Sequence, residues 1–297
     1  MWLAVGVTDP IQTPPVRRPE DAGRFARAGG RNRFTARPAT VTRVERIAPA
    51  LIRVSVTGPE FADFPQAGPA DHVKLFFPDP ATGELVAPVA VGPDEDGIVR
   101  PDRASIARDY TPIVRRTADG VELDLDFFVH ADPGPASAWA ESASVGDELV
   151  VVGPRGSKRA PQAVDGAVLV CDESSLPSVS QWIRDFPAGV TVDVVAAVAG
   201  DPSWVSDYLV PADGVALRLH IAGETGADWM PALRALGPIG EGTFVWAAGD
   251  ASQLVAVRRY LRRELGLPAA QAIVSGYWRP GVTAFDHHAP IDPTDPE

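Results

Sequence analysis

Cysteine is nearly absent from this 297-residue sequence, which contains one, at position 171. A single thiol cannot form an intramolecular disulfide, and such scarcity is typical of a reducing cytosol. Because Cys171 ends the apolar run 167–171, we interpret it as a buried strand residue rather than a reactive thiol. No apolar stretch reaches the ~20 residues of a transmembrane helix. Residues 1–7 are apolar but lack the basic flank of a signal peptide, so we expect a cytoplasmic protein without membrane insertion.

Positive charge is also scarce, with 27 Lys and Arg against 39 Asp and Glu and a net charge of −12. This balance argues against nucleic acid and anionic membranes as partners. An acidic protein that binds an anionic ligand needs local clusters of basic residues, so arginines and lysines near glycines gain weight. We expect a monomer.

Two common motifs are missing. The sequence has no G-x-G-x-x-G dinucleotide fingerprint. Its histidines at 72, 220, 287 and 288 show no metal-ligand spacing with one another or with Cys171, so we expect no bound catalytic metal. We interpret the pair His287–His288 as a solvated feature of the tail. A basic run on the last predicted helix is interpreted likewise, as a solvated face: Arg258, Arg259, Arg262 and Arg263.

Short alternating segments dominate the first half of the chain. Period-two patterns predict strands at 40–45 and 51–56, and short segments at 72–77, 106–111, 121–129 and 148–152 complete about six strands, with one helix at 136–142. Many short strands broken by Gly and Pro indicate a small antiparallel barrel at 33–160. The interval 78–101 is expected to be a loop with a hairpin near 84–91. Residues 1–32 are expected to form a mobile arm or a strap over the barrel.

The rhythm changes after residue 161. Apolar runs at 167–171, 190–198, 215–221, 243–247 and 271–275 alternate with helix-length segments, which predicts a parallel sheet covered on both faces. The clearest helix is 255–265, with Gly266 as its stop signal. We therefore expect an α/β nucleotide-binding domain at 161–280 and a tail at 281–297.

The run Arg108-Asp109-Tyr110-Thr111-Pro112 is the most informative motif. On an extended strand Arg108 and Tyr110 share a face, which presents a phosphate-binding guanidinium beside an aromatic plane. Pro112 keeps Thr111 extended, with its hydroxyl pointing away from that pair. The alternative is a surface arginine and a core tyrosine.

A strand end and a helix start follow about twenty residues later. Gly134 permits a turn, Pro135 suits the first helical position, and the first turn offers free N–H groups to an anion. Together with the preceding motif, this order indicates a site for a flavin dinucleotide. We assign it five further residues: Phe128, Val129, His130, Ala136 and Ser137. For His130 a structural role is the alternative.

Polar residues also follow two apolar runs of the second domain. Asp172, Glu173 and Ser174 come after the first run, at the crevice where parallel sheets bind nucleotides. Contact with a nicotinamide cofactor is one interpretation, and a helix cap by Ser174 or Ser175 is the other. Gly249 and Asp250 end another run at the same edge, where a residue without a side chain lets a ring approach the backbone.

Five ordered motifs carry a resemblance: DHVKLFFP at 71–78, RDYTP at 108–112, GPRGS at 153–157, CDES at 171–174 and GYWR at 276–279. Together they resemble the siderophore-interacting protein family, the flavin-dependent ferric-siderophore reductases, over about residues 33–279. The resemblance implies a ferredoxin-reductase-like fold, FAD, NADPH or NADH as donor, and a ferric chelate as acceptor. One departure is Ile113, where many members carry arginine.

The same resemblance implies further site residues. Tyr277 and Trp278 would border the flavin. A basic pocket of Lys74, Arg155 and Arg279 would attract an anionic ferric siderophore. The alternative is that Arg155 serves the flavin phosphates and Lys74 is merely exposed.

We therefore expect hydride transfer from NADPH or NADH to FAD and single-electron reduction of chelated iron. The sequence leaves open which siderophore and which nucleotide are used. Two alternatives remain: an NAD(P)H–flavin oxidoreductase with another acceptor, and a siderophore- or flavin-binding module without turnover.

Overall fold

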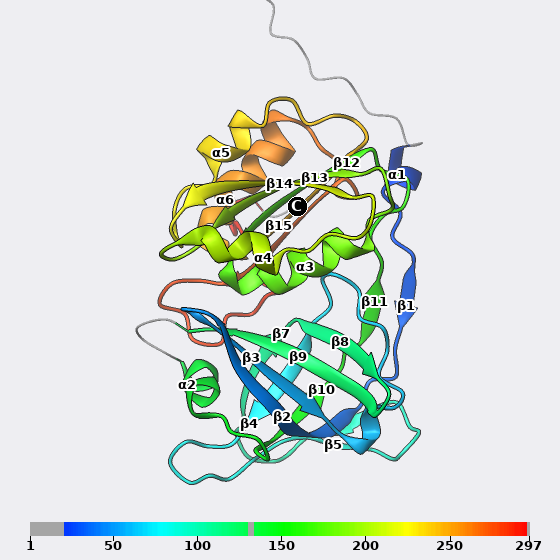
Figure 1. The fold of residues 1–297 in the computed structure, drawn as a ribbon, viewed down its shortest axis with the longest axis vertical. Helices are drawn as coiled ribbons and strands as arrows, with labels where there is room; N and C mark the ends of the chain where they lie inside the picture. The colour runs from blue at the N-terminus through cyan, green and yellow to red at the C-terminus, as the bar shows by residue number, and fades with distance from the viewer. Residues whose placement is uncertain (1–20, 130–133, 296–297) are drawn as a thin grey trace, which may run out of the picture.

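The structure is a computed structural model that describes residues 21–129 and 134–295. An antiparallel barrel and a parallel α/β sheet are stacked along the long axis of the molecule (Figure 1). This is the two-domain order that the sequence predicts, with the chain leaving the barrel after β10 (Glu148–Val152).

The barrel is a sheet with the strand order β7-β4-β10-β2-β3-β9-β8. These strands are β2 (Ala36–Ala48), β3 (Leu51–Thr57), β4 (Val73–Phe77), β7 (Ile106–Tyr110), β8 (Pro112–Thr117), β9 (Gly120–Phe128) and β10. Only Thr111 separates β7 from β8, which lie at opposite edges of the sheet, so one bent strand serves both edges. Counted in this way, the barrel has the six strands predicted.

Inward-facing residues of alternating strands fill the barrel, among them Val54, Leu75, Leu123 and Phe127. A short helix, α2 (Pro135–Ser142), packs against this core through Ala136 and Ala140. The hairpin expected near 84–91 is shifted. The structure instead pairs β5 (Val89–Ala90) with β6 (Ile98–Val99), and the short helical turn η1 (Pro59–Phe61) follows β3.

The second domain is a parallel sheet with the order β14-β13-β12-β15-β16. Its strands are β12 (Gly166–Asp172), β13 (Thr191–Ala197), β14 (Ala216–Gly223), β15 (Thr243–Asp250) and β16 (Ala272–Trp278). Cys171 on β12 is fully buried, and burial raises the pKa of its thiol. The strand order reverses between β12 and β15: β13 and β14 lie on one side of this pair and β16 on the other. The carboxyl ends of β12 and β15 are therefore the switch point of the sheet.

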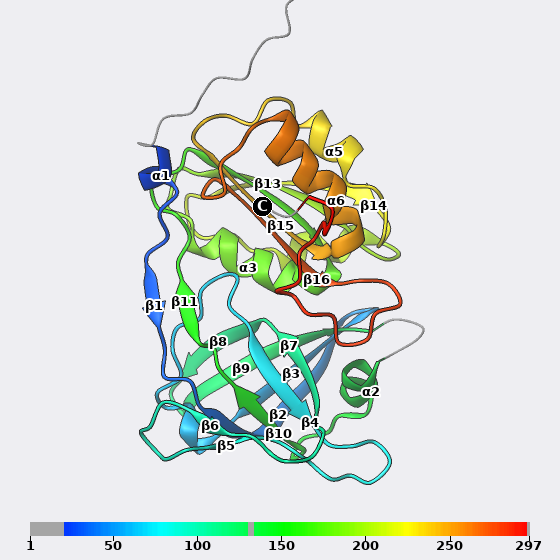
Figure 2. The same ribbon diagram turned by 180° about the vertical axis from the view of Figure 1, so that it is seen from behind.

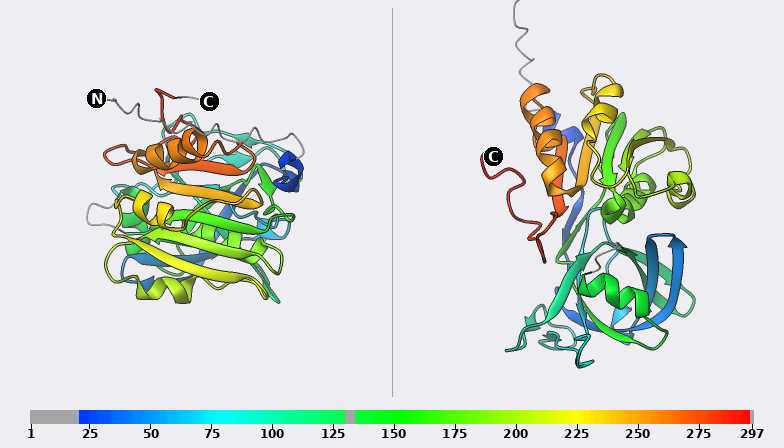
Figure 3. Two further views of the ribbon diagram at one scale, coloured as in Figure 1. Left: turned by 90° about the horizontal axis from the view of Figure 1, so that it is seen from above. Right: turned by 90° about the vertical axis from the view of Figure 1, so that its left-hand side faces the viewer.

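Helices cover both faces of this sheet (Figure 3). One face carries η2 (Glu173–Ser175), α3 (Leu176–Asp185), η3 (Pro202–Trp204) and α4 (Val205–Tyr208); the other carries α5 (Met230–Ala235), α6 (Ala251–Arg259) and the π-helical turn η4 (Tyr260–Glu264). Gly266 ends the last helix at φ +64°, a left-handed conformation that suits glycine. None of the helices in 21–129 and 134–295 is long and apolar enough to cross a membrane.

The described part of the N-terminal arm packs against the second domain. This corrects the expectation of a strap over the barrel. After α1 (Asp21–Arg24), Phe25 is 2% exposed and belongs to the core that contains Trp182. The Arg27 guanidinium lies 4.8 Å from the Trp182 ring. Then β1 (Gly29–Arg31) pairs with β11 (Gly156–Lys158) along the side of the molecule (Figure 2).

The C-terminal tail descends toward the barrel and returns to α6 (Figure 2). Asp292 accepts a hydrogen bond from Arg259 at 2.5 Å, and Asp295 pairs with Arg258 and Arg263. Arg262 donates to the carbonyls of two residues beyond the helix. The predicted solvated face is wrong for Arg258, which is 6% exposed, whereas Arg259 and Arg263 are exposed as predicted and also hold the tail.

Candidate functional site

Strand β7 places Arg108 and Tyr110 on one face, as the alternation predicts. Their cross-strand partners Leu75 and Val73 are fully buried, so this face is the inner side of the barrel. The half-buried Tyr110 ring packs 4.3 Å from the Phe127 ring. Nη1 of Arg108 donates to the carbonyl of its neighbour Ala107 at 2.7 Å, which leaves the other N–H groups of the fork for a ligand.

The start of α2 lies at the end of β9. Gly134 is the extended N-cap, and a side chain there would meet nothing within 4 Å. The Ser137 hydroxyl donates to the carbonyl of Phe128 at 3.1 Å, so it ties the helix start to the strand. Val129 and Ala136 pack against the barrel core. His130 lies outside the described residues.

These residues fit FAD by the chemistry of their donors. A guanidinium and the open N-terminus of α2 suit a pyrophosphate, and an aromatic plane suits a fused ring. Trp139, which we did not predict, extends the aromatic group, with its ring 5.1 Å from Phe77 and 5.7 Å from Phe127. Its position three residues after Ala136 on a helix places both on one side, and that spacing was the available signal.

A chain of hydroxyls joins the two domains. The buried Thr111 hydroxyl lies 3.0 Å from that of Ser178 on α3, and Ser178 lies 3.0 Å from the hydroxyl of Tyr277 on β16. Thr111 thus points away from the Arg108–Tyr110 pair, as expected. Burial raises the pKa of Tyr277 to about 12. Ser178 was also missed, since a helical serine carries little signal by itself.

Asp172 organises the carboxyl ends of three strands. Its carboxylate accepts hydrogen bonds from the backbone N–H and hydroxyl of Ser174, the N–H of Asp250 and Nε1 of Trp278, at 2.5 to 3.0 Å. Burial raises the pKa of this carboxyl to about 6, against these hydrogen bonds. Asp172 caps the turn η2, whereas Ser175, at the N-cap of α3, makes no side-chain cap hydrogen bond, so the predicted serine cap is absent from α3.

The interpretation of Gly249 needs correction. A Cβ at this position would lie 2.4 Å from an Asp172 carboxylate oxygen, and the residue has φ +139°. The space that we assigned to a ligand ring is therefore filled by Asp172. The neighbouring Asp250 caps α6, with Oδ1 accepting from the N–H of Ser252 at 2.8 Å.

Glu173 faces the other half of the sheet. Its Oε1 accepts a hydrogen bond from the N–H of Ala199, after β13. It also accepts one from the hydroxyl of Thr225, after β14, at 2.5 Å. The side chain is 2% exposed, and Oε2 is buried without a hydrogen-bond partner in the part of the chain that is described.

The three basic residues predicted to bind the substrate have different surroundings. Lys74 pairs with Asp109 across β4 and β7 at 2.8 Å. Although burial opposes it, hydrogen bonds from His287 and Lys74 lower the pKa of Asp109 to about 2. Arg155 is exposed, with its guanidinium 4.0 Å from the Phe34 ring. Arg279 is half-buried against the tail, where it donates to the carbonyl of Ile291 at 3.2 Å.

An antiparallel barrel with these donors, followed by a parallel sheet with an acidic switch point, defines a ferredoxin-reductase-like flavoprotein. Residues 40–158 match the model of the siderophore-interacting FAD-binding domain, and residues 164–281 match that of the siderophore-interacting protein. The chain belongs to the siderophore-interacting protein family.

Relatives and solved structures agree with this family. The NADPH-dependent ferric-chelate reductase of Escherichia coli is 33% identical over 250 residues, which cover 84% of this chain and 94% of that protein. A siderophore utilization protein from T. fusca superposes with a TM-score of 0.77 at 34% identity, over 89% of this chain and all of that one. A ferredoxin reductase of carbazole 1,9a-dioxygenase, 17% identical over 82% of this chain and 70% of that one, shares the fold with a TM-score of 0.56.

The family, the two-part fold and the FAD-binding first domain that the sequence predicted are thereby confirmed. The roles of individual site residues remain predictions, as do the domain boundaries.

Proposed function

We propose that the protein reduces ferric siderophores in the cytoplasm, as a monomer, with electrons from NADPH or NADH. FAD, when bound, accepts a hydride from the nicotinamide and passes electrons one at a time to chelated iron. The similarity to a ferric-chelate reductase over nearly its whole length supports this function. So does the name of a more distant relative, the ferric vibriobactin reductase of Vibrio cholerae, 26% identical over 83% of this chain and 90% of that protein.

The observation that carries the proposal is the contact between the β7–β8 strand of the barrel and the parallel-sheet domain. Thr111, at the bend between β7 and β8, meets Ser178 on α3 beside the switch point. Through this contact a nucleotide held near Asp172 and Asp250 would face a ring held by Tyr110. Arg108 and the start of α2 would bind the phosphates, while Tyr277 and Trp278 would border the ring.

The acceptor would bind at the outer face of the barrel, where Lys74 and Arg155 would supply positive charge and Arg279, just after β16, would add a third cation. Such a pocket attracts anionic catecholate complexes even on an acidic protein, because the nearby positive charges outweigh the more distant negative charges. A protein that reduces another acceptor, or only binds a chelate or flavin, is the rival explanation.

Anaerobic spectroscopy separates these possibilities. NADPH or NADH should bleach the flavin absorbance of the purified protein, and a ferric siderophore should restore it. Bleaching without recovery by several ferric chelates would favour another acceptor, and no bleaching would favour a binding module.

Lys74→Ala and Arg155→Ala test the acceptor pocket, and Lys158→Ala is the matched control for the lysine. Lys74→Ala and Arg155→Ala should raise KM for an anionic ferric chelate several-fold and leave flavin reduction nearly unchanged, since a remote charge contributes mainly to substrate binding. Lys158→Ala, on β11, should keep the wild-type KM. Equal slowing of flavin reduction and iron reduction would instead assign Lys74 and Arg155 to the cofactors.

A further inference from the structure

Three imidazoles that are far apart in the sequence meet at the outer face of the barrel. The ring of His287, from the tail, lies 4.4 Å from that of His72 and 4.0 Å from that of His288. The rings of His72 and His288 are 6.5 Å apart. The expectation that His287 and His288 are solvated tail residues is therefore wrong for His287, which is half-buried.

This histidine cluster (His72, His287 and His288) adjoins the predicted acceptor site. His72 and Lys74 are separated by one residue and are both exposed, whereas Val73 between them is buried, so the two side chains share the outer face. Lys74 pairs with Asp109, and Nδ1 of His287 lies 3.4 Å from the same carboxylate. One carboxylate thus joins the lysine to the cluster.

Part of the cluster is left without a hydrogen-bond partner. Nε2 of His287 is buried and unpartnered within the described residues. No group of three or more His, Cys, Asp or Glu in 21–129 and 134–295 has the arrangement of a metal-ligand set. Protons are the ions that these imidazoles can still carry.

The surroundings disfavour charge on His72 while the site holds no anion. Although part of His72 is exposed, loss of hydration where the His287 ring packs on it, and then the charge of His287, lower the pKa of His72 to about 4. Asp109 acts in the opposite direction, while His288 and Lys74 lower the pKa further. An anionic chelate beside Lys74 would reverse this balance, because a nearby negative charge favours the imidazolium form.

We propose that the histidine cluster takes up protons when an anionic ferric chelate binds beside Lys74 and donates them to the chelator's oxygens as the iron is reduced. The inference rests on the proposed function and adds the source of the protons. Phenolate or catecholate oxygens released from iron carry negative charge, and an imidazolium 3 Å or so away is a suitable acid near neutral pH.

Each iron takes one electron that originates from the nicotinamide nucleotide, whose two electrons serve two irons, so Fe(III) becomes Fe(II). Each Fe–O bond that then breaks leaves its electron pair on the oxygen. The imidazolium N–H bond breaks while an O–H bond forms on the released oxygen. The neutral imidazole then regains a proton from water, so the cluster serves the next oxygen or the next chelate.

A gallium(III) catecholate complex tests proton uptake without turnover, because gallium(III) is not reduced by flavins. Binding to the wild-type holoprotein at pH 7 in weak buffer should take up protons, read with an indicator dye. His72→Gln and His288→Gln should each lose roughly half or more of this uptake, because the linkage follows the titrating groups. Wild-type affinity for the complex should rise as the pH falls from 7 to 5, and His72→Gln should flatten this rise.

His220→Gln is the matched control. His220 lies on β14 in the second domain and pairs with Asp193 at 2.8 Å, far along the chain from the cluster. It should keep the wild-type uptake and pH dependence. Unchanged uptake in both cluster variants, or equal loss in His220→Gln, would overturn the inference.

The failure of the inference can be told apart from failure of the proposed function. If the wild-type protein reduces ferric siderophores but binds the gallium complex without proton uptake, the function stands and the inference falls. If neither ferric reduction nor gallium-complex binding occurs, the proposed acceptor site itself is wrong.

Discussion

Two neighbouring carboxylates, Asp172 and Glu173, hydrogen-bond to different strand ends around the switch point. Asp172 binds groups on β15 and β16, and Glu173 binds groups that follow β13 and β14. Asp172 is the last residue of β12, and Glu173 is the first residue of the turn η2. Together they fix the loops on which a nucleotide would rest.

Replacing Asp172 by asparagine should change how stability depends on pH. The native pKa of this carboxyl is raised to about 6 from 3.8, mainly by burial, so the native state binds its proton more tightly than the unfolded state. The resulting stabilisation is complete below pH 3.8 and is lost as the pH rises through about 6, with an upper limit of about 3 kcal/mol.

Urea unfolding at pH 4 and pH 7 measures this difference. The wild-type free energy of unfolding should fall over that interval relative to Asp172→Asn, in which the group does not titrate. Parallel pH profiles for the two proteins would show that the carboxyl keeps an ordinary pKa.

Gly249→Ala should destabilise the protein by more than the backbone conformation alone explains. Positive φ costs a non-glycine residue about 1–2 kcal/mol, and the new Cβ would also overlap the Asp172 carboxylate at 2.4 Å. Gly120→Ala is the matched control, since its φ is +136° but nothing lies within 4 Å of the Cβ. Thermal unfolding should show a larger loss for Gly249→Ala, and equal losses would rule out the overlap.

Among the elements, the bent strand formed by β7 and β8 links fold and site most directly. Its first half carries Arg108 and Tyr110, its bend carries Thr111, and its second half closes the barrel against β9. The sequence predicted the first half, up to Thr111, but not the second, which begins at Pro112; proline is tolerated as the first residue of a strand.

Arg108→Ala should yield a folded protein that loses FAD during purification. A charge-assisted hydrogen bond contributes about 1.5–3 kcal/mol, so FAD affinity should fall roughly tenfold or more. Arg103→Ala is the control, because Arg103 is exposed and pairs with Glu84 in the loop before β7. Fluorescence titration of the apoproteins with FAD measures both affinities, and wild-type binding by Arg108→Ala would remove the phosphate role.

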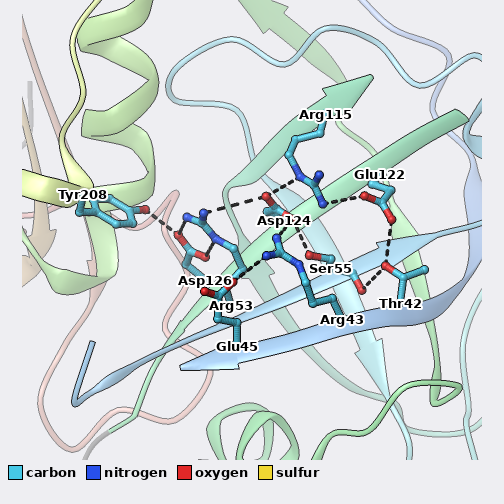
Figure 4. Close-up of polar contacts among 10 residues, drawn as sticks. All are labelled: Thr42, Arg43, Glu45, Arg53, Ser55, Arg115, Glu122, Asp124, Asp126 and Tyr208. Carbon is cyan, nitrogen blue, oxygen red and sulfur yellow. Dashed lines mark hydrogen bonds and ion pairs between the residues drawn. The ribbon is translucent and has the colours of Figure 1, made fainter. Parts of the chain in front are cut away.

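At the scale of the whole molecule, a polar network on the barrel reaches into the second domain (Figure 4). Arg53 binds Asp126 through two hydrogen bonds of 2.7 Å, and the hydroxyl of Tyr208 on α4 donates to the same carboxylate at 2.6 Å. The network continues along the strands through Asp124, which accepts from Ser55 and Arg115. Tyr208 is its contribution from the second domain.

Tyr208→Phe should weaken this contact between the domains. Loss of a hydrogen bond to a charged group should lower the free energy of unfolding by about 1.5–3 kcal/mol. Because small displacements of reacting groups are costly, flavin reduction by the nucleotide should also slow several-fold. Tyr260→Phe, within the second-domain core, should change stability without this kinetic effect. Stopped-flow bleaching of the flavin compares the two, and equal rates would limit Tyr208 to a stabilising role.

Contacts at this scale were the hardest to predict from the sequence. Local alternation revealed the strands and the flavin motif, since both depend on neighbours within a few residues. The tail folds back on distant parts of the chain. His287 approaches His72, more than two hundred residues earlier, and Asp295 approaches Arg263, more than thirty residues earlier. A sequence pattern carries no record of such returns, and charged side chains that hold the tail look like a solvated face.

The position of Phe25 affects the order in which the molecule can assemble. This residue precedes the barrel in the chain but belongs to the core of the second domain. During synthesis it emerges early, yet the residues that bury it, Trp182 among them, emerge after the whole barrel. The barrel can therefore form first, and Phe25 can be buried only after the second domain has been made. A gene fragment starting at residue 161 would lack this residue, so the second domain produced alone would expose a gap beside Trp182.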